Sequence, residues 1–575
     1  MLKRIFEVNS FFSNVLIPLI ALALYCRTFA YFSSRFLTEG VNYYFASRLE
    51  KYIWFALAGA VLIFLTLLWQ SPNGIRRSKG KLYAGDFFLL FLPLTPIVQY
   101  ILKNQETLSV RGSLYIILFF LFFSSIYVLV IPTLLGTAVR SRTLMTVGLA
   151  FVFTVLSMSS LSAYFKWFEM GALRKQLMVL GGVFLFIWVL YNLEQRKVLY
   201  FFIIAIFLFN SSSLLLAQPK EDDSSSSGFE KNKLLTLVDG KMPASTPNIY
   251  LLIYDAYVPN ETMLAYGIDN SAQEQYLVDQ GFVLYPHTYS IGSASAATMS
   301  RVLNASSGFY GNRKRAVSGD GVVQKIVKDM GYETYGLFPT DYMFRDFGSS
   351  YDHSVPEKSV PPYMLMAKAI LVGEFRFDIE NVGFAPQARE QFVQSKRDIF
   401  TNIPENHVFM YTHSNLPSHS QNSGACLPNE TELYHERLTQ ANSEMKQDLD
   451  LLVQNDPGAI IIVAGDHGPY LTKNCFELNG LYPASEITRL DIQDRYGTFL
   501  AIRWPTNNYA TYDKITVLQD VFPAVFAYLY QDTSILASKV EPTRTSPDSI
   551  SEVYVEDGII HGGPNDGEPL YVSGK

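Results

Sequence analysis

The chain has 575 residues, of which 49% are hydrophobic and 17% charged, and its formal net charge is −6. These averages hide two halves of different composition. Long apolar segments fill the part before residue 218, whereas apolar and polar residues are mixed after it, which excludes a chain of uniform type. The two halves therefore predict different structures.

Residues 1–217 contain a series of long apolar segments separated by short loops. A bilayer core requires roughly 20 apolar residues, so we expect an α-helical membrane domain of about seven spans. The spans are expected at Ser10–Tyr31, Tyr52–Trp69, Phe87–Leu102, Ser113–Leu135, Met145–Phe165, Leu177–Tyr191 and Val198–Leu216. Acidic residues are almost absent from these segments, which favours an anchor or a lipid-binding platform over an ion-coupled transporter.

Basic residues near the first two spans predict the orientation of this domain. Lys3 and Arg4 precede the first span, and a basic loop follows the second, so the positive-inside rule places both in the cytoplasm. An odd number of spans then places the chain after Leu216 outside the cytoplasm. The expected location is the cytoplasmic (inner) membrane, with an extracytoplasmic C-terminal half.

Residues 218–246 are polar and include a serine run, a composition typical of a linker that does not fold alone. From 247 to 530 strand and helix patterns alternate, which is typical of an α/β domain with a largely parallel sheet. Strands are expected at Asn248–Tyr254, Thr334–Phe338, His407–Thr412, Ile460–Ala464 and Gly497–Arg503, and helices at Met263–Gln280, Gly321–Met330, Glu432–Val453 and Val517–Tyr530. Residues 531–575 form a C-terminal extension.

Two of these strands end at an acidic residue. Asp255 follows the first strand, and Asp466 follows the run Ile460–Ala464 and one glycine. The carboxyl ends of parallel strands face the ligand-binding crevice of an α/β sheet. With His467 beside Asp466, these side chains are candidate ligands of a divalent metal; an ordinary polar turn is the alternative.

A hydroxyl-rich turn, Tyr289–Arg301, leads into an expected helix at Thr298–Leu303. A hydroxyl at a helix N-terminus is well placed to attack phosphorus or sulfur, because the terminal N–H groups stabilise the incoming anion. A metal bound to that hydroxyl would lower its pKa. Ser293, Ser295 and Thr298 are the candidates, and an ordinary N-cap serine is the alternative.

Together these elements resemble the alkaline phosphatase superfamily, and within it the sulfatase-like lipoteichoic acid synthases and phosphoethanolamine transferases, over residues 247–529. The resemblance implies an alkaline-phosphatase-like α/β fold in which the nucleophile Ser295 and the side chains of Asp255, Asp466 and His467 hold one divalent metal ion, Mn²⁺ or Zn²⁺. Sulfatases have Cys-x-Pro-Ser-Arg where this chain has Ser295-Ala-Ala-Thr298, without Cys, Pro or Arg. This difference argues against sulfate ester hydrolysis.

The resemblance also implies roles for residues outside the metal site. His419, in the segment Tyr411–His419, is expected to act beside the leaving group as a general acid or phosphate donor, with His413 as the alternative. Arg345 is expected to bind phosphate, and His413 and Thr298 are further candidates for substrate binding.

The expected activity is transfer of a phospholipid-derived head group, phosphoglycerol or phosphoethanolamine, to a cell-surface glycan or lipid through a phosphoserine. The expected partners are the phospholipid donor, that acceptor and the membrane, with no nucleic acid. The alternatives are a membrane-anchored hydrolase of phosphate or sulfate esters and an inactive sensor or assembly factor. The second alternative is kept because Ser295 stands where the transferases mostly have Thr.

The three cysteines divide between the two halves. Cys26 lies in the first expected span, whereas Cys426 and Cys475 lie in loops of the extracytoplasmic half. An isolated pair in an oxidising compartment predicts a disulfide, and two free thiols are the alternative.

Overall fold

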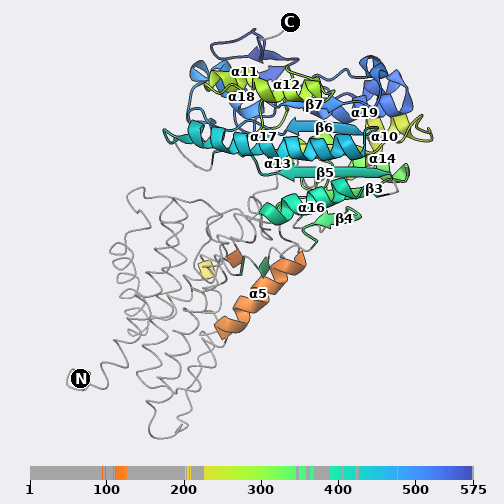
Figure 1. Ribbon diagram of the computed structural model, residues 1–575. Coiled ribbons are helices and arrows are strands. Elements are labelled where there is room, and N and C mark those ends of the chain that lie inside the picture. The colour runs from red at the N-terminus through yellow and green to blue at the C-terminus, as the bar shows by residue number, and fades with distance from the viewer. Residues whose placement is uncertain are drawn as a thin grey trace, which may run out of the picture. The chain divides into compact units, whose positions relative to one another are not determined.

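The computed structural model describes residues 110–125 and 226–572, the latter with gaps at 312, 345–348, 358–362, 365, 368–388, 405–406, 421–425 and 476, together with isolated positions between 94 and 208 (Figure 1). The chain divides into two compact units. One comprises Met1–Pro219 and Val360–Val382, and the other comprises Lys220–Ser359 and Gly383–Lys575.

Helix α5 (Val110–Ser125) is the one continuous element described in the first unit. Its sequence is apolar from Leu114 to Phe123, and the helix covers part of the span expected at Ser113–Leu135. Among the described residues, no helix combines the length and the apolarity that crossing a bilayer requires. Apart from α5 and isolated positions, the expected spans lie outside the described residues and stay a prediction.

The second unit is built on a seven-stranded sheet with the order β2-β7-β6-β1-β5-β3-β4. The inner strands β6, β1, β5 and β3 are parallel with one another, and β4 is parallel to β3, whereas β7 is antiparallel to β6 and β2 is antiparallel to β7. The strands are β1 (Ile249–Tyr254), β2 (Val283–Leu284), β3 (Glu333–Leu337), β4 (His353–Val355), β5 (Val408–Ser414), β6 (Ile460–Gly465) and β7 (Leu500–Arg503). The largely parallel α/β sheet that strand and helix alternation predicts is confirmed.

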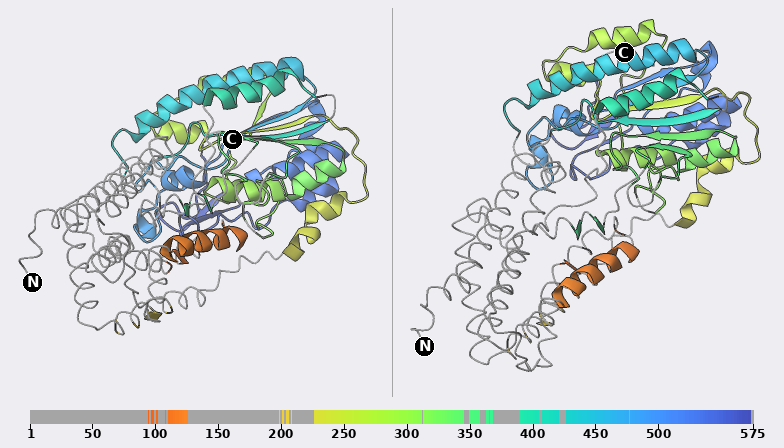
Figure 2. Two further views of the ribbon diagram at one scale, coloured as in Figure 1. Left: turned by 90° about the horizontal axis from the view of Figure 1, so that it is seen from below. Right: turned by 60° about the horizontal axis from the view of Figure 1, so that its bottom comes forward.

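Helices cover both faces of this sheet, because successive side chains of a buried strand point to opposite sides. Ile249, Leu251 and Ile253 of β1 pack with one helical layer, and Tyr250 and Leu252 pack with the other. The first layer contains α10 (Lys233–Val238), α13 (Ser295–Asn304), α14 (Val322–Asp329) and α19 (Val521–Tyr530). The second contains α11 (Asn260–Ala265), α12 (Ser271–Asp279), α16 (Arg389–Thr401) and α17 (Glu430–Asn455), and Figure 2 shows the long α17 on the side opposite α13 and α14.

Strand register brings the two strand-ending acids to the same edge of the sheet. Tyr254, the last residue of β1, pairs with Gly465, the last residue of β6, so Asp255 and Asp466 leave neighbouring strands at the same level. On the other side of β1, Ile253 pairs with His413 of β5. One short edge of the sheet therefore carries two carboxylates and an imidazole.

The segment expected as a linker at 218–246 is folded from Ser226 onward. A 3₁₀ helix, η6 (Ser226–Lys231), and α10 carry Phe229, Leu234 and Val238 into the core beside α14. This segment contains too few apolar residues to fold alone. It is folded because those apolar side chains are buried against the core of the second unit.

The C-terminal extension also belongs to this unit. Its hairpin, β8 (Tyr554–Glu556) and β9 (Ile559–His561), packs in an apolar cluster with Tyr289 and Ile291 of the hydroxyl-rich turn. The remaining elements are α18 (Arg489–Tyr496), η8 (Ala484–Glu486), η9 (Asn507–Thr511), η10 (Leu518–Asp520) and η11 (Thr533–Ser538).

Several expected boundaries are corrected. The helix expected at Met263–Gln280 is two helices, since the chain turns at Gly267 with a φ of 82°. The strand expected from Gly497 begins at Leu500, and the helix expected from Thr298 begins at Ser295. The predicted disulfide is confirmed: Cys426 and Cys475 are bonded, with their Cα atoms 5.0 Å apart. Cys26 lies outside the described residues.

Candidate active site

Asp466 is held by its backbone surroundings so that one oxygen faces the site. Its Oδ1 accepts the N–H of Ala256 at 3.0 Å and that of His467 at 2.9 Å. Its Oδ2 and the Oδ1 of Asp255 are buried and have no hydrogen-bond partner among the described residues. Two buried carboxylate oxygens without donors are costly unless a cation compensates them.

The two histidines face these oxygens. The Nδ1–H of His467 donates to the carbonyl of Gly468 at 2.8 Å, which leaves the lone pair on Nε2. That Nε2 lies 3.4 Å from Asp255 Oδ1 and 3.5 Å from Asp466 Oδ2. His413 contacts the Tyr411 hydroxyl through Nδ1 at 2.8 Å, and its Nε2 lies 3.4 Å from Asp466 Oδ2.

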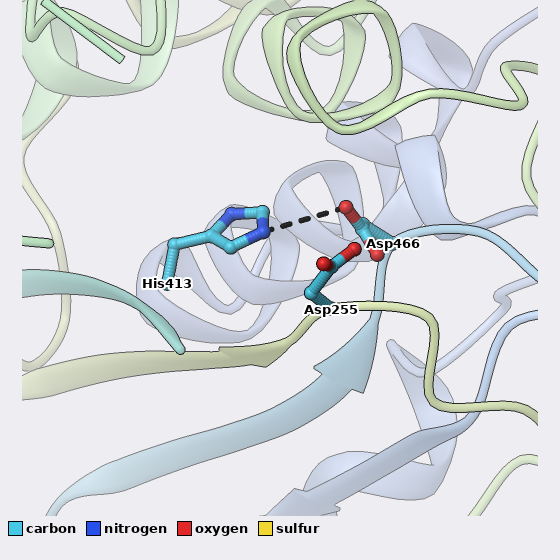
Figure 3. A group of neighbouring side chains, drawn as sticks. All are labelled: Asp255, His413 and Asp466. Carbon is cyan, nitrogen blue, oxygen red and sulfur yellow. Dashed lines mark ion pairs between the residues drawn. The ribbon is translucent and has the colours of Figure 1, made fainter. Parts of the chain in front are cut away.

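Figure 3 shows Asp255, His413 and Asp466 converging from three neighbouring strands. One ligand atom from each of these residues lies within 4.8 Å of the others. Carboxylate oxygens and imidazole nitrogens suit a divalent ion such as Mn²⁺ or Zn²⁺. The residues present therefore fit the expected metal, and they add His413 to the ligand set expected from the sequence.

The groups around Asp466 favour the ionised form of its carboxylate. Burial raises the pKa of Asp466, but His467, His413 and the N–H of Ala256 lower it by more, so the net pKa lies well below its ordinary value. The carboxylate is therefore a charged acceptor ready for a cation.

Among the three candidate hydroxyls, that of Ser295 contacts His467. Ser295 is the first residue of α13, is partly exposed, and places Oγ 3.2 Å from His467 Nε2. Ser293 is buried, and its Oγ accepts a hydrogen bond from Ser549 at 2.8 Å. Thr298 is also buried, and its Oγ1 accepts from Ser290 at 3.1 Å. In the described contacts, the hydroxyls of Ser293 and Thr298 are thus used within the fold.

His419 lies beside the cluster. Its ring centroid is 5.7 Å from that of His467, and its Nδ1 lies 2.6 Å from the carbonyl oxygen of Ser420. Burial lowers the pKa of His419, and the nearby Asp255 opposes that effect only in part, which favours a neutral imidazole. Arg345, the expected phosphate ligand, lies outside the described residues.

Tyr470 is a site residue that the sequence analysis missed. Its ring stacks on His467 with centroids 5.1 Å apart and planes at 12°, and its hydroxyl donates to the carbonyl of Ser293. The guanidinium of Arg495 lies 4.6 Å from its ring centroid. The only signal in the sequence is the position of Tyr470 four residues after Asp466, which does not reveal where its ring points.

The backbone is unusual beside three of these residues. Ala256, Ser418 and Tyr470 have positive φ angles of 60°, 65° and 58°. Non-glycine residues in this conformation carry strain and gather at sites where a side chain must be aimed. Ala256 follows Asp255, and Ser418 precedes His419, so the strain lies where the chain turns the side chains of Asp255 and His419 into the site.

No family model matches the chain, and no curated protein matches it. Several solved structures do. One is the C-terminal periplasmic domain of EcEptC from Escherichia coli in complex with Zn, at 8% identity, over 55% of this chain and 93% of that chain, with a TM-score of 0.36. Another is the lipoteichoic acid synthase LtaP from Listeria monocytogenes, at 14% identity, over 60% and 90%, with a TM-score of 0.35.

A third match is a protein in the alkaline phosphatase superfamily from Vibrio parahaemolyticus, at 13% identity, over 60% of this chain and 91% of that chain, with a TM-score of 0.35. At such low TM-scores the matches add no weight to a function, which depends on the site itself. What the chain shares with these three structures is a similarity of fold.

Proposed function

We propose that this chain is a metal-dependent phosphotransferase that moves a phospholipid-derived head group to a cell-surface acceptor through a phosphoserine at Ser295. One observation carries the proposal. Ser295 Oγ lies 3.2 Å from His467 Nε2, and that nitrogen lies within 3.5 Å of two buried carboxylate oxygens that have no hydrogen-bond partner among the described residues. A hydroxyl at such a cluster is suited to nucleophilic attack on phosphorus.

Asp255, Asp466 and His467 would hold the metal, with His413 as a further ligand. When bound, a divalent cation would lower the pKa of the serine hydroxyl and polarise the phosphoryl oxygens. The geometry of the site also disfavours an inactive sensor. Two buried carboxylate oxygens without hydrogen-bond donors are costly, and this cost is offset only when a cation is bound.

The chain's own residues account for the other steps. Ser295 Oγ attacks phosphorus, a new O–P bond forms, and the bond from phosphorus to the diacylglycerol oxygen breaks. The neutral imidazole of His419 takes up the proton that Ser295 loses and passes it to the departing diacylglycerol oxygen, the role that the family resemblance implies. An acceptor hydroxyl then attacks phosphorus and loses its proton to His419, and the Ser295 oxygen takes up that proton as it leaves.

The start of α13 is suited to holding the phosphoryl group. Ala294 occupies the N-cap, is exposed and makes no side-chain capping bond. Ser, Thr, Asp or Asn is preferred at this position, because each satisfies a terminal N–H. Ala294 leaves the first N–H groups of the helix to a bound anion.

The apolar N-terminal half supports a lipid donor. A catalytic unit tethered outside the cytoplasm to about seven spans reaches the head group of a phospholipid without extracting the lipid. The head group is phosphoglycerol or phosphoethanolamine, and the acceptor is a surface glycan or lipid.

The test is to trap the phosphoenzyme from purified full-length protein and a phospholipid labelled in its head group. Ser295→Ala should abolish labelling and transfer while the protein stays folded, because deleting one hydroxyl at a helix start costs about 1 kcal/mol or less. Ser293→Ala is the matched control and should keep the label.

Label on Ser293 or Thr298 would overturn the assignment of the nucleophile. Undiminished transfer by Ser295→Ala, without any covalent adduct, would exclude the phosphoserine route. Release of the free head group at the same rate with and without acceptor would identify a hydrolase instead.

A further inference from the structure

A short loop connects the two histidines that follow each other along this part of the chain. It runs from His413, near the end of β5, to His419. Asp255 and Asp466 directly follow the last residues of paired strands, so the sheet fixes where they lie. His419 follows no strand, and its position therefore depends on the contacts that this loop makes.

Two arginines bind this loop, one on each half. Arg389, the first residue of α16, contacts the half next to β5, because its Nη2 donates to Ser414 Oγ at 3.2 Å and its Nη1 to Asn415 Oδ1 at 2.5 Å. Its charge is paired with the carboxylate of Glu444 in α17. This half of the loop is thus held by an arginine whose charge is already compensated.

Arg437 of α17 contacts the half next to His419. Its Nε donates to the carbonyl of Pro417 at 2.6 Å, two residues before His419. On the same face of α17, the Tyr434 hydroxyl donates to the carbonyl of Ala256 at 2.9 Å, in the turn that follows β1. The first turns of α17 therefore support the backbone beside a candidate metal ligand and the backbone beside the candidate proton carrier.

The surroundings of Arg437 differ from those of an arginine that only stabilises the fold. Its guanidinium forms no ion pair among the described residues, and its Nη2 is buried there without a hydrogen-bond partner. Burial lowers the pKa of Arg437, and the nearby Glu430 and Asp255 raise it by less. A buried donor without a partner is costly, and such costs gather where function fixes a side chain.

We infer that Arg437 is a positioning residue that sets the place of His419 for proton transfer. Proton transfer requires heavy atoms about 2.6–3.2 Å apart, so a small shift of the imidazole is enough to slow it. Backbone hydrogen bonds of Ser418 and Ser420, each 2.9 Å long, hold the residues on either side of His419. Arg437 adds a charged side-chain donor, which a substitution removes without touching those two bonds. The inference deepens the proposed function and rests on the role of His419 in it.

The experiment is a double-mutant cycle in full-length protein, with the release of diacylglycerol from saturating phospholipid as the measured rate. Arg437→Met keeps the length of the side chain and removes the donor, so it should lower kcat roughly 10- to 100-fold and leave the metal content unchanged. Arg437→Lys should lose less, because its ammonium still donates to the carbonyl of Pro417.

Arg503→Met is the matched control. Arg503 also donates to a backbone carbonyl, that of Pro457, at 2.8 Å. It pairs with Ile461 near the start of β6, so it lies at the edge of the sheet away from the site. Its substitution removes the same kind of hydrogen bond and should leave kcat unchanged.

His419→Ala and the double variant separate positioning from a general structural effect. If Arg437 acts through His419, the double variant should be no slower than His419→Ala alone, because the group that Arg437 positions is already absent. Losses that multiply in the double variant, loss of metal in Arg437→Met, or a wild-type rate in Arg437→Met would each overturn the inference.

The same cycle is measured on cleavage of the 4-nitrophenyl esters of phosphoglycerol and phosphoethanolamine, which replace the lipid donor. Wild-type cleavage of such an ester without any release of diacylglycerol would refute the phospholipid donor of the proposed function. A double variant no slower than His419→Ala would then still uphold the role of Arg437. A wild type that is inactive on both kinds of substrate would refute the function and the inference together.

Discussion

Tyr470 contacts both His467 and the turn that precedes Ser295, and so holds these two parts of the candidate site in a fixed relative position. Its ring lies against His467, and its hydroxyl holds the carbonyl of Ser293 in the turn before the nucleophile. Arg495, buried and paired with Asp494, lies over the same ring. Tyr470 is therefore a positioning residue, because it reaches neither the metal ligands' oxygens nor the Ser295 hydroxyl in the described contacts.

Tyr470→Phe should separate these two contacts, because it keeps the stacked ring and removes one hydrogen bond. A hydrogen bond of this kind is worth about 1 kcal/mol, so we expect kcat to fall roughly fivefold with metal content unchanged. Steady-state kinetics with parallel metal analysis checks this. A loss of metal in Tyr470→Phe would instead show that the hydroxyl supports the metal site.

Asp466→Asn should show that the two carboxylates form a cation site. The amide lacks the charge that attracts a cation, so the affinity for Mn²⁺ or Zn²⁺ should fall more than about tenfold. Even substitution of a residue that only hydrogen-bonds to a metal ligand typically lowers metal affinity by about tenfold or more. Equilibrium dialysis with elemental analysis measures this, and Asp450→Asn on the exposed side of α17 is the matched control.

The same variant should also lower the stability of the protein without metal. With a chelator present at neutral pH, Asp466→Asn should unfold at a lower temperature than wild type, because the lowered pKa of Asp466 shows that His467, His413 and the Ala256 N–H stabilise its charged form. Wild-type metal content in Asp466→Asn would contradict the assignment of this ligand.

Among the elements, α18 fixes the loop that follows Tyr470. Thr488 caps the helix in a capping box with Asp491, and Lys473 of the loop donates to Asp491 Oδ2 at 2.7 Å. Burial raises the pKa of Asp491, but the hydrogen bonds from Lys473 and Thr488 lower it by more, so the net pKa is below its ordinary value. The ionised carboxylate therefore ties this loop to the helix.

The sign of the resulting pH dependence follows from this lowered pKa. A carboxylate with a depressed folded pKa stabilises the fold above its unfolded pKa of about 4, and this contribution is lost as pH falls through the folded pKa. Asp491→Asn should therefore lower the melting temperature at pH 6 and narrow the gap to wild type toward pH 3. Thermal unfolding across this range is the measurement, with Glu432→Gln on an exposed position of α17 as control. A gap that stays constant with pH would contradict the role of the charge.

At the scale of the whole molecule, the first folded residues of the second unit determine where a protease can cut it from the N-terminal half. Because Phe229 and Leu234 are buried in its core, cleavage is expected before Ser226 and not within η6 or α10.

Protease added to intact spheroplasts should release this unit in one piece, with its N-terminus before Ser226, while a cytoplasmic marker stays intact. Mass spectrometry of the released fragment reads the cut site. Protection of the unit in intact spheroplasts, together with cleavage after lysis, would reverse the expected topology.

The sequence by itself determined the central strands, because the apolar runs of β1, β5 and β6 are long enough to require burial on both faces. It also determined that Asp255 and Asp466 end two of these strands, and that Cys426 and Cys475 form a pair. The strands and the acids that end them depend on local composition, which a single segment displays without its neighbours. The cysteine pair was predictable because the C-terminal half contains only two cysteines.

Only the tertiary structure decided which groups meet. Strand register placed His413 beside Asp466, and the turn before α13 aimed Ser295 at His467 while it buried Ser293 and Thr298. The fold of residues 226–246 was decided in the same way, because its few apolar side chains are stable only against a core made by distant segments. Such contacts join residues far apart in the chain, and a pattern of residues read along one segment does not contain them.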